Sequence, residues 1–355
     1  MADVQPFRAV RYARPDPVQT APPYDVITPA DRERYLRADP HNVVHLTLND
    51  SEEEAGRLYR SWLEEGVLVQ ESEPCAWAVR QRYVGPDGVA RTREGLVASL
   101  RVEPYETGSV LPHERTHAGP KESRLRLLRA AGAQLEPIFL LYDGDPPLAP
   151  SDGPADLEAA GTSMWRVDGS ALPQFFADRQ LLIADGHHRY ETALAYAAEQ
   201  GTPASARMMV VLVSTADPGL EIFPTHRVFS GRPDLQPAGE PLPSLAAALE
   251  RLRDEPRHRA VAVAYRGGAA TLVHGERGEL DVELVDRHGQ QGLSYTPEVD
   301  EAVRRVDEGE GDVAFLLRAT RIEDVFERAR RGRVMPQKTT YFFPKLTSGL
   351  LFHPV

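Results

Sequence analysis

The chain has 355 residues, of which 41% are hydrophobic and 26% charged, a composition that indicates an ordinary globular protein and excludes a disordered or fibrous one. At roughly 150 residues per domain, this length predicts two or three domains. The formal net charge of −12 argues against general binding to nucleic acids or anionic membranes, because both favour a basic surface. We therefore expect a small-molecule partner, no nucleic-acid partner and no membrane association.

The N-terminal segment and the cysteine content bear on the cellular location. MADVQPFRAVRY lacks the apolar run of a secretory signal. The apolar runs around Ile138 and Met208 are far shorter than the roughly 18 residues of a membrane span. The single cysteine, Cys75, cannot form an internal disulfide. We expect a cytoplasmic protein.

Hydrophobic periodicity and turn residues predict the elements of the first half of the chain. The first fifty residues are rich in proline and predict loops with one short helix in DRERYLRAD. The following elements are, in order, a helix over residues 52–68 that stops at Gly66, a β-hairpin over residues 77–102 with its turn at residues 86–88, a helix over residues 120–132, and a buried strand over residues 135–143.

The second half predicts more alternation of strands and helices. PPLAPSDGPADLEAAG indicates a surface loop, and residues 230–244 indicate a domain linker. The remaining elements are a strand at MWRVD, a strand and helix over residues 181–199, a strand over 207–215, a helix over 245–255, strands over 259–267 and 269–275, and a helix over 297–309. This alternation predicts a mixed α/β fold, with an N-terminal α/β region over residues 1–232 and an α+β region over residues 233–355.

The segment LLIADGHHRYETALAYAAE turns from an apolar strand into an amphipathic helix. The first amide groups of a helix lack intrahelical partners and favour an anion. Gly186 allows a phosphate to approach the backbone, Arg189 offers a forked donor, and Asp185 can cap the helix or orient a ligand hydroxyl. His187 and His188 are too far apart around a helix to chelate one metal, so we expect one of them to face the ligand. The alternative is that Asp185 only caps the helix and both histidines lie on the surface.

The segment LPHERTHAG contains the pattern H-E-x-x-H of a zinc site. We reject zinc because that site needs a long helix, whereas Pro112 precedes this pattern and Gly119-Pro120 ends it. As an active-site loop, the segment offers Glu114 as a base or metal ligand and His113 as an acid or hydrogen-bond donor. An inert surface loop is the alternative.

Two shorter motifs add candidates for the site. In PTHRVF, His226 and Arg227 repeat the pairing of an imidazole with a guanidinium, although an ordinary loop explains them as well. In APPYDVIT, the rigid Pro-Pro entry holds Tyr24 and Asp25, for which a plain turn is the alternative.

The last segment, MPQKTTYFFPKLTSGLLF, is apolar and patterned, unlike most chain ends. We expect it to pack back onto the body of the protein and to carry Lys338 and Lys345 into a site. Thr339 and Thr340 add hydroxyl groups beside them.

The motifs PPYDVI, LPHERT, ADGHHRYETA, PTHR and MPQKTTYFFPK, in this order, resemble the bacterial and archaeal domain-of-unknown-function 1015 family over nearly the whole chain. Where that family has an acidic residue in PKxDR, this chain has Ser123, next to Glu122. The DGHHR turn also resembles the phosphate-binding box of the ParB/sulfiredoxin-like superfamily, which includes free-serine kinases. This resemblance implies a ParB/sulfiredoxin-like core with an additional α+β C-terminal region.

Together the motifs and the resemblance imply a small-molecule phosphotransferase that acts on L-serine or a similar hydroxyl compound. A nucleotide or pyrophosphate donor would bind at Gly186, His187, His188 and Arg189, with positive charge added by His226, Arg227, Lys338 and Lys345. Glu114 or Asp185 would accept the hydroxyl proton, Mg²⁺ would bridge carboxylate and phosphate, and Tyr24 and Asp25 would hold the substrate amine.

Other functions remain open. A non-catalytic, nucleotide-binding regulatory module is the first alternative, and a ParB-like nuclease is disfavoured by the net charge. No G-x-G-x-x-G follows a strand, so no redox cofactor is expected. The oligomeric state is open.

Overall fold

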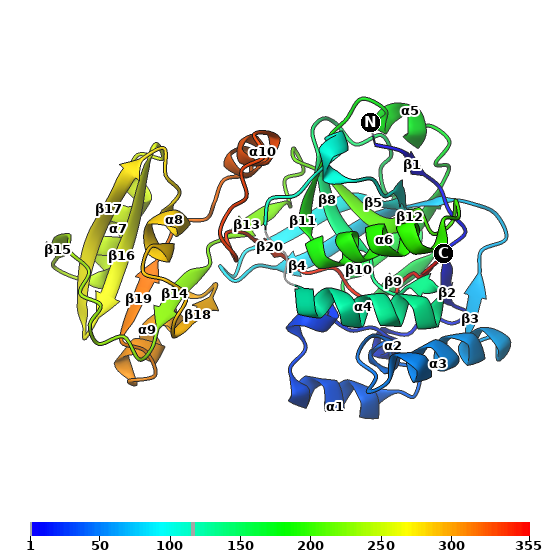
Figure 1. Cartoon of the computed structure of the whole chain (residues 1–355), viewed down its shortest axis with the longest axis horizontal. Coiled ribbons are helices and arrows are strands. Elements are labelled where there is room, and N and C mark those ends of the chain that lie inside the picture. The colour runs from blue at the N-terminus through cyan, green and yellow to red at the C-terminus, as the bar shows by residue number, and fades with distance from the viewer. Residues whose placement is uncertain (1, 115–117) are drawn as a thin grey trace.

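The computed structural model describes residues 2–114 and 118–355 (Figure 1). A large body contains a nine-stranded sheet, and a smaller body contains a six-stranded sheet. The C-terminal segment leaves the smaller body and returns to the larger one, where both termini lie.

The nine-stranded sheet is mixed. Its strands lie in the order β6 (Val110–Leu111), β11 (Leu181–Asp185), β8 (Ile138–Tyr142), β12 (Arg207–Ser214), β5 (Ala90–Arg101), β4 (Ala76–Val84), β10 (Thr162–Val167) and β9 (Leu157–Ala159), and β1 (Val4–Gln5) pairs with β5. The pairs β6–β11 and β8–β12 are parallel, and the other pairs are antiparallel. Parallel neighbours end at the same edge of a sheet. The segment that follows β6 therefore lies beside the segment that follows β11.

The two faces of this sheet have different covers. Side chains alternate between the faces of a strand, so Ile138 and Leu140 pack with Tyr190 of α6 (His187–Gln200), under the helical cover that also includes α5 (Leu172–Phe176). On the other face, Phe139 packs in a cluster with Phe342 of the C-terminal segment and with side chains of α10 (Ile322–Arg330). The chain end is therefore part of the core.

A helical layer flanks the large sheet. It contains α1 (Pro29–Ala38), α2 (Val44–Thr47), α3 (Glu52–Glu64) and α4 (Ala118–Ala131), and the short turns η1 (Pro17–Gln19), η2 (Tyr24–Val26) and η3 (Tyr105–Thr107) lie in the connecting loops. Trp62, Leu127 and Phe352 pack in one cluster between these helices and the chain end. Two small ladders, β2 (Val10–Tyr12) with β3 (Leu68–Gln70) and β7 (Ala133–Gln134) with β21 (His353–Pro354), complete this side.

The six-stranded sheet is antiparallel throughout. Its order is β15 (Glu240–Leu242), β17 (Ala269–Arg277), β16 (Arg259–Arg266), β19 (Val313–Leu316), β14 (His226–Phe229) and β18 (Leu293–Thr296). Helices α7 (Leu245–Asp254) and α9 (Val299–Asp307) pack in one core cluster, and α8 (Asp281–Asp286) packs in another with alternate residues of β16. The ladder of β13 (Glu221–Phe223) with β20 (Tyr341–Phe343) joins the outgoing chain to the returning one.

The mixed α/β prediction is confirmed, as are the β4–β5 hairpin and the helix that ends before Gly66. The expected surface loop PPLAPSDGPADLEAAG contains an edge strand, β9, because its last residues pair with β10. The division at residue 232 stays a prediction, and the strands on both sides of residues 230–239, β14 and β15, belong to the six-stranded sheet. None of the helices in the described ranges has the length and apolar character needed to cross a bilayer.

Candidate functional site

A cavity of about 260 Å³ lies where β11 ends. Segments that are far apart in the sequence meet there: the η2 turn, the residue that follows β6, the β11–α6 turn and the C-terminal segment. The lining residues are Tyr24, Asp25, Glu114, Ala184, Asp185, Gly186, His187, His188, Arg189, Lys338, Thr340 and Lys345. The structure thus brings together ten of the thirteen residues predicted from the motifs. The exceptions are His113, His226 and Arg227.

The β11–α6 turn forms the floor of the cavity. Gly186 is the N-cap of α6, with φ 102°, and a Cβ there would lie 2.5 Å from Cγ2 of Ile138. Both the backbone conformation and the close approach require glycine. In the described part of the chain, no side chain forms a cap hydrogen bond at this helix start. The N-terminus of α6, with its partial positive charge, therefore lies at the cavity.

Asp185 is held by two cations. Arg189 Nη2 lies 2.8 Å from Asp185 Oδ2, and Lys345 Nζ donates to Oδ1. Burial raises the pKa of the Asp185 carboxyl, but Lys345 and Arg189 outweigh burial and hold this pKa below its usual value. Burial lowers the pKa of Lys345, and Asp185 outweighs it in the opposite direction. Asp185 is therefore a charged anchor and a poor proton acceptor.

Arg189 was predicted to offer its guanidinium to a ligand, but protein groups already accept hydrogen bonds from part of it. Besides its bond to Asp185, its Nη1 donates to the carbonyl of Pro137. Its side chain is only 11% exposed. Two of its three nitrogens thus bind the protein itself, and the guanidinium stiffens the turn around Gly186.

Glu114 lies beside Asp185 because β6 and β11 are parallel neighbours. Its backbone forms a parallel β-bridge with Met335, which places the C-terminal segment beside the cavity. Burial raises the pKa of the Glu114 carboxyl, and the opposing effects of Lys338, through its charge and its main-chain amide, are smaller. A carboxyl group with a raised pKa suits proton transfer near neutral pH. Of the two predicted bases, Glu114 has the raised pKa and Asp185 the lowered one.

His113 lies behind the cavity wall and is fully buried. Its Nδ1 is 2.7 Å from the carbonyl oxygen of Ile183, and its Nε2 is 3.0 Å from Oγ1 of Thr340. Burial lowers the pKa of His113 to about 4, so the ring is neutral at pH 7. His113 thus lies behind the wall with both ring nitrogens bonded to protein groups, and its predicted role as an acid or hydrogen-bond donor stays a prediction.

His187 and His188 of the DGHHR turn line the cavity at the start of α6. Burial lowers the pKa of His187 well below its usual value, and the main-chain amide of His113 donates to its Nε2 over 3.2 Å. The rings of His113 and His187 meet edge to face, with centroids 4.7 Å apart. His188 contributes to the lining and is partly buried.

The structure places His226 and Arg227 in β14, away from the cavity lining. Arg227 is fully buried and donates to Asp286 over 3.0 Å, to the Thr225 carbonyl over 2.6 Å and to the Gln337 carbonyl over 3.3 Å. His226 Nδ1 accepts from the Leu317 amide over 3.1 Å. Both residues thus bind protein groups, and Arg227 supports the main chain next to Lys338.

Tyr24 was predicted from its motif, but the two residues that hold it in place, Glu136 and Arg124, were not. Its amide donates to Glu136 over 3.1 Å, and the guanidinium of Arg124 lies 4.3 Å from the centre of its ring. Glu136 also accepts from the Ser348 hydroxyl over 2.7 Å. Arg124 is the arginine of the PKxDR pattern, whereas Glu136 belongs to no quoted motif, and its contact with Tyr24 becomes visible only in the fold.

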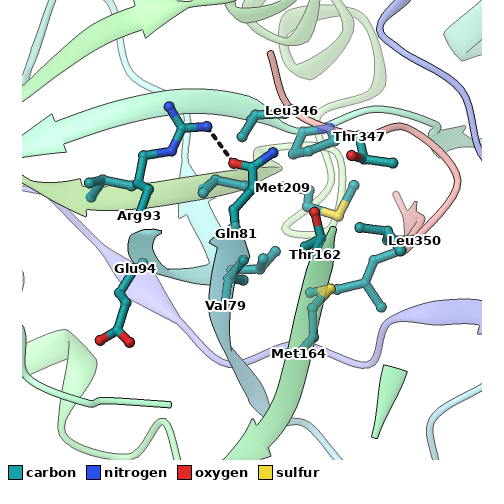
Figure 2. Close-up of a pocket in the computed structure, with 16 residues that line it drawn as sticks. Val79, Gln81, Arg93, Glu94, Thr162, Met164, Met209, Leu346, Thr347 and Leu350 are labelled. Atoms are coloured by element: carbon teal, nitrogen blue, oxygen red, sulfur yellow. Dashed lines mark hydrogen bonds between the residues drawn. The ribbon is translucent and has the colours of Figure 1, made fainter. Parts of the chain in front are cut away.

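A second, smaller cavity of about 40 Å³ lies beneath the segment that carries Lys345 (Figure 2). At its edge, the buried Arg93 bonds Gln81 over 2.5 Å and the Pro344 carbonyl over 2.8 Å. Gln81 in turn donates to the Lys345 carbonyl over 3.3 Å. Arg93 and Gln81 therefore fix the main chain from which the Lys345 side chain reaches Asp185.

Metal-binding groups are sparse. Within residues 2–114 and 118–355, no cluster of three or more His, Cys, Asp or Glu side chains could hold a metal ion. His117, the second histidine of the rejected zinc pattern, lies outside the described residues together with Arg115 and Thr116. A metal here would depend on one or two carboxylates and on ligand oxygens.

Comparison with known proteins identifies the family. The model of the family described as "Protein of unknown function (DUF1015)" matches residues 4–288. The chain belongs to this family, as its ordered motifs predicted. No curated protein matches it.

Solved structures are similar to the chain at a low level. A conserved hypothetical protein from Pyrococcus furiosus is 18% identical, with a TM-score of 0.35, and the match covers 68% of this chain and 92% of that one. A free serine kinase in complex with AMP is 18% identical, with a TM-score of 0.39 and coverages of 68% and 89%. SbnI with a C-terminal truncation, from Staphylococcus aureus, is 13% identical, with a TM-score of 0.40 and coverages of 70% and 84%. Similarities of this size assign no activity to the chain.

Buried histidines predict a loss of stability in mild acid. Burial lowers the pKa values of His113, His226 and His353 to about 4. Between about pH 6.5 and pH 4 the unfolded chain binds these protons and the folded chain does not, so the free energy of unfolding falls by up to about 1.4 kcal/mol per pH unit for each histidine. Above pH 7 these groups contribute no pH dependence. Urea titrations from pH 7.5 to pH 4.5 measure the slope.

The matched variants for this test are His353→Gln and His258→Gln. His353 is buried, so its replacement should flatten the slope between pH 6.5 and pH 4.5, whatever its effect on absolute stability. His258 is exposed and serves as the control, for which the wild-type slope should remain. An unchanged slope in His353→Gln would contradict the assignment of a neutral, buried ring.

Proposed function

We propose that the chain transfers a phosphoryl group from a nucleotide or pyrophosphate to a small hydroxyl compound, with L-serine as the first candidate. One observation carries this proposal: the cavity joins a helix N-terminus, two lysines and a carboxyl group with a raised pKa. Phosphoryl transfer needs alignment and charge neutralisation more than covalent help from the protein. L-serine comes from the resemblance of the DGHHR turn to the free-serine-kinase box.

The donor phosphate would lie at the start of α6. The main chain near Gly186 allows a close approach, and the helix dipole favours negative charge there. Lys345 and Lys338 would add charge from the C-terminal segment. Because Lys345 is already bonded to Asp185, it is held in place before the ligand arrives, which reduces the ordering cost of binding.

The acceptor would lie between Glu114 and the η2 turn. Its hydroxyl oxygen forms a bond to the terminal phosphorus of the donor while the bond from that phosphorus to its bridging oxygen breaks. The hydroxyl proton passes to the Glu114 carboxylate, and the leaving group keeps the bridging oxygen with the electron pair. Asp25 is the carboxylate available to an ammonium group of the acceptor.

Mg²⁺ belongs to the same proposal. Magnesium in phosphoryl-transfer sites is commonly held by one or two carboxylates together with phosphate oxygens, and in this cavity a carboxylate other than the proton acceptor Glu114 would hold it. A bound Mg²⁺ would supply positive charge to the phosphate oxygens. A cytoplasmic location, where nucleotides are available, is proposed with it.

The direct test of this function uses the purified chain with L-serine, Mg²⁺ and either ATP, ADP or pyrophosphate. Phosphoserine detected by mass spectrometry with one of the three donors is the expected result. Donor binding measured by calorimetry without any phosphoserine would favour the regulatory-module alternative and reject the kinase.

The variant Glu114→Gln tests the proton acceptor. Loss of a positioned base typically costs about 10²- to 10⁴-fold in rate, so kcat should fall by that range while the donor still binds. Glu158→Gln, at an exposed position of β9, is the matched control and should keep wild-type kcat. A wild-type kcat in Glu114→Gln would remove Glu114 from the mechanism.

Lys338 offers a second test because its backbone is strained. It has φ 56°, and Ala160, in the β9–β10 turn, has φ 49°. A left-handed conformation costs a non-glycine residue about 1 kcal/mol, which glycine avoids. Lys338→Gly should therefore keep or raise stability by up to about 1 kcal/mol while kcat/KM falls at least about tenfold, because one cation leaves the cavity.

Ala160→Gly is the matched control for Lys338→Gly. It relieves a similar strain far from the cavity lining, so its thermal midpoint should hold or rise while its kcat/KM stays at the wild-type value. Equal activity in the two variants would show that the charge of Lys338 does not serve the reaction.

A further inference from the structure

The hydrogen bonds of His113 determine where its ring proton lies. Its Nδ1 is 2.7 Å from the Ile183 carbonyl oxygen, and a carbonyl oxygen can only accept. Nδ1 therefore carries the hydrogen. Because burial lowers the pKa of His113 to about 4, the ring holds one proton at pH 7, and Nε2 has a free lone pair.

The tautomer of His113 in turn determines how Thr340 bonds. Thr340 Oγ1 lies 3.0 Å from His113 Nε2, which can only accept in this tautomer. The hydroxyl of Thr340 must therefore donate its single proton to the ring. A hydroxyl has one proton and two lone pairs, so its remaining capacity is that of an acceptor. Thr340 belongs to the cavity lining, where it thus presents an oxygen that accepts and does not donate.

The tautomer of His187, which also lines the cavity, follows from the same reasoning. Its Nε2 accepts from the His113 amide over 3.2 Å, and its ring is neutral because burial lowers its pKa. The ring proton of His187 therefore lies on Nδ1, which is a donor group. The rings of His113 and His187 thus both carry their proton on Nδ1.

We propose that Thr340 is a specificity-determining residue whose hydroxyl oxygen accepts a hydrogen bond from the ammonium or hydroxyl group of the acceptor substrate. The inference rests on the proposed function and assigns the Thr340 side of the cavity to the acceptor. An ionised phosphate has no proton to offer this oxygen and is disfavoured there. Thr340 would therefore separate the acceptor end of the cavity from the phosphate end.

The first test determines the tautomer of His113 by NMR and does not depend on catalytic turnover. In protein labelled with ¹⁵N-histidine, the signals of His113 are assigned by their loss in His113→Gln. The expected result at pH 7 is a protonated Nδ1 and an unprotonated Nε2, with the Nε2 shift moved in Thr340→Val because its donor is lost. A protonated Nε2 in the wild-type protein would overturn the inference.

The second test compares Thr340→Val with Thr340→Ser. The valine has nearly the same shape but no hydroxyl, so the dissociation constant of L-serine, measured by calorimetry, should rise at least about tenfold. The serine variant keeps the hydroxyl and should stay within about threefold of wild type. The dissociation constant of the donor should be unchanged in both. Thr347→Val, on the same segment but at the second cavity, is the control and should match wild type.

3-Hydroxypropanoate, which keeps the 3-hydroxyl group of L-serine and has no donor in place of the ammonium, identifies the donor group of the substrate. Thr340→Val should weaken L-serine alone if the ammonium is bound, and both compounds if the hydroxyl is bound. Equal L-serine binding in Thr340→Val and wild type overturns the assignment of Thr340. Because calorimetry does not need turnover, L-serine binding without phosphoserine would reject the kinase proposal alone, and absence of both in the wild-type protein would reject both proposals.

Discussion

The structure of the candidate site depends on the buried carboxylate of Asp185, which lies between Arg189 and Lys345. Arg189 comes from the same turn, whereas Lys345 is 160 residues away in the sequence. Removing Lys345 would take away part of the charge compensation of this carboxylate and would leave it to Arg189. This ion pair therefore ties the C-terminal segment to the strand–helix turn, and through that segment Lys338 and Thr340 reach the same cavity.

The C-terminal segment has a packing role as well as a chemical one. Phe342 and Leu351 belong to the core cluster that covers one face of the nine-stranded sheet. The buried side chains of Arg93 and Gln81, which Figure 2 shows bonded to each other, also donate to the carbonyls of Pro344 and Lys345 and so fix this main chain. Because the sheet needs this cover to bury its apolar face, folding of the large body and assembly of the cavity happen together.

The strand, glycine and helix around Gly186 could be predicted because their signals are local: apolar residues, a glycine and then a helical period. The partners of the charged groups could not, since they are set by tertiary contacts. His113 stands next to Glu114 in the sequence, yet the packing of β6 against β11 leaves its ring between Ile183 and Thr340. Arg227 resembles Arg189 in its motif, but Asp286 of another element binds it.

Under the proposed function, the charges around the cavity would favour a phosphate donor that enters together with a cation. The lining contains three cations, Arg189, Lys338 and Lys345, and three carboxylates, Asp25, Glu114 and Asp185, so it is balanced before a ligand arrives. A donor phosphate adds negative charge to a partly buried space, where uncompensated charge is costly. In the proposed reaction, the compensation would come from cations that enter with the reactants, Mg²⁺ with the donor and an ammonium group with the acceptor. Proton transfer to Glu114 acts in the same direction, because it removes one negative charge from the wall as the hydroxyl oxygen bonds to phosphorus. Under that proposal, the donor would bind together with Mg²⁺, and the ammonium group of the acceptor would supply further positive charge when it enters.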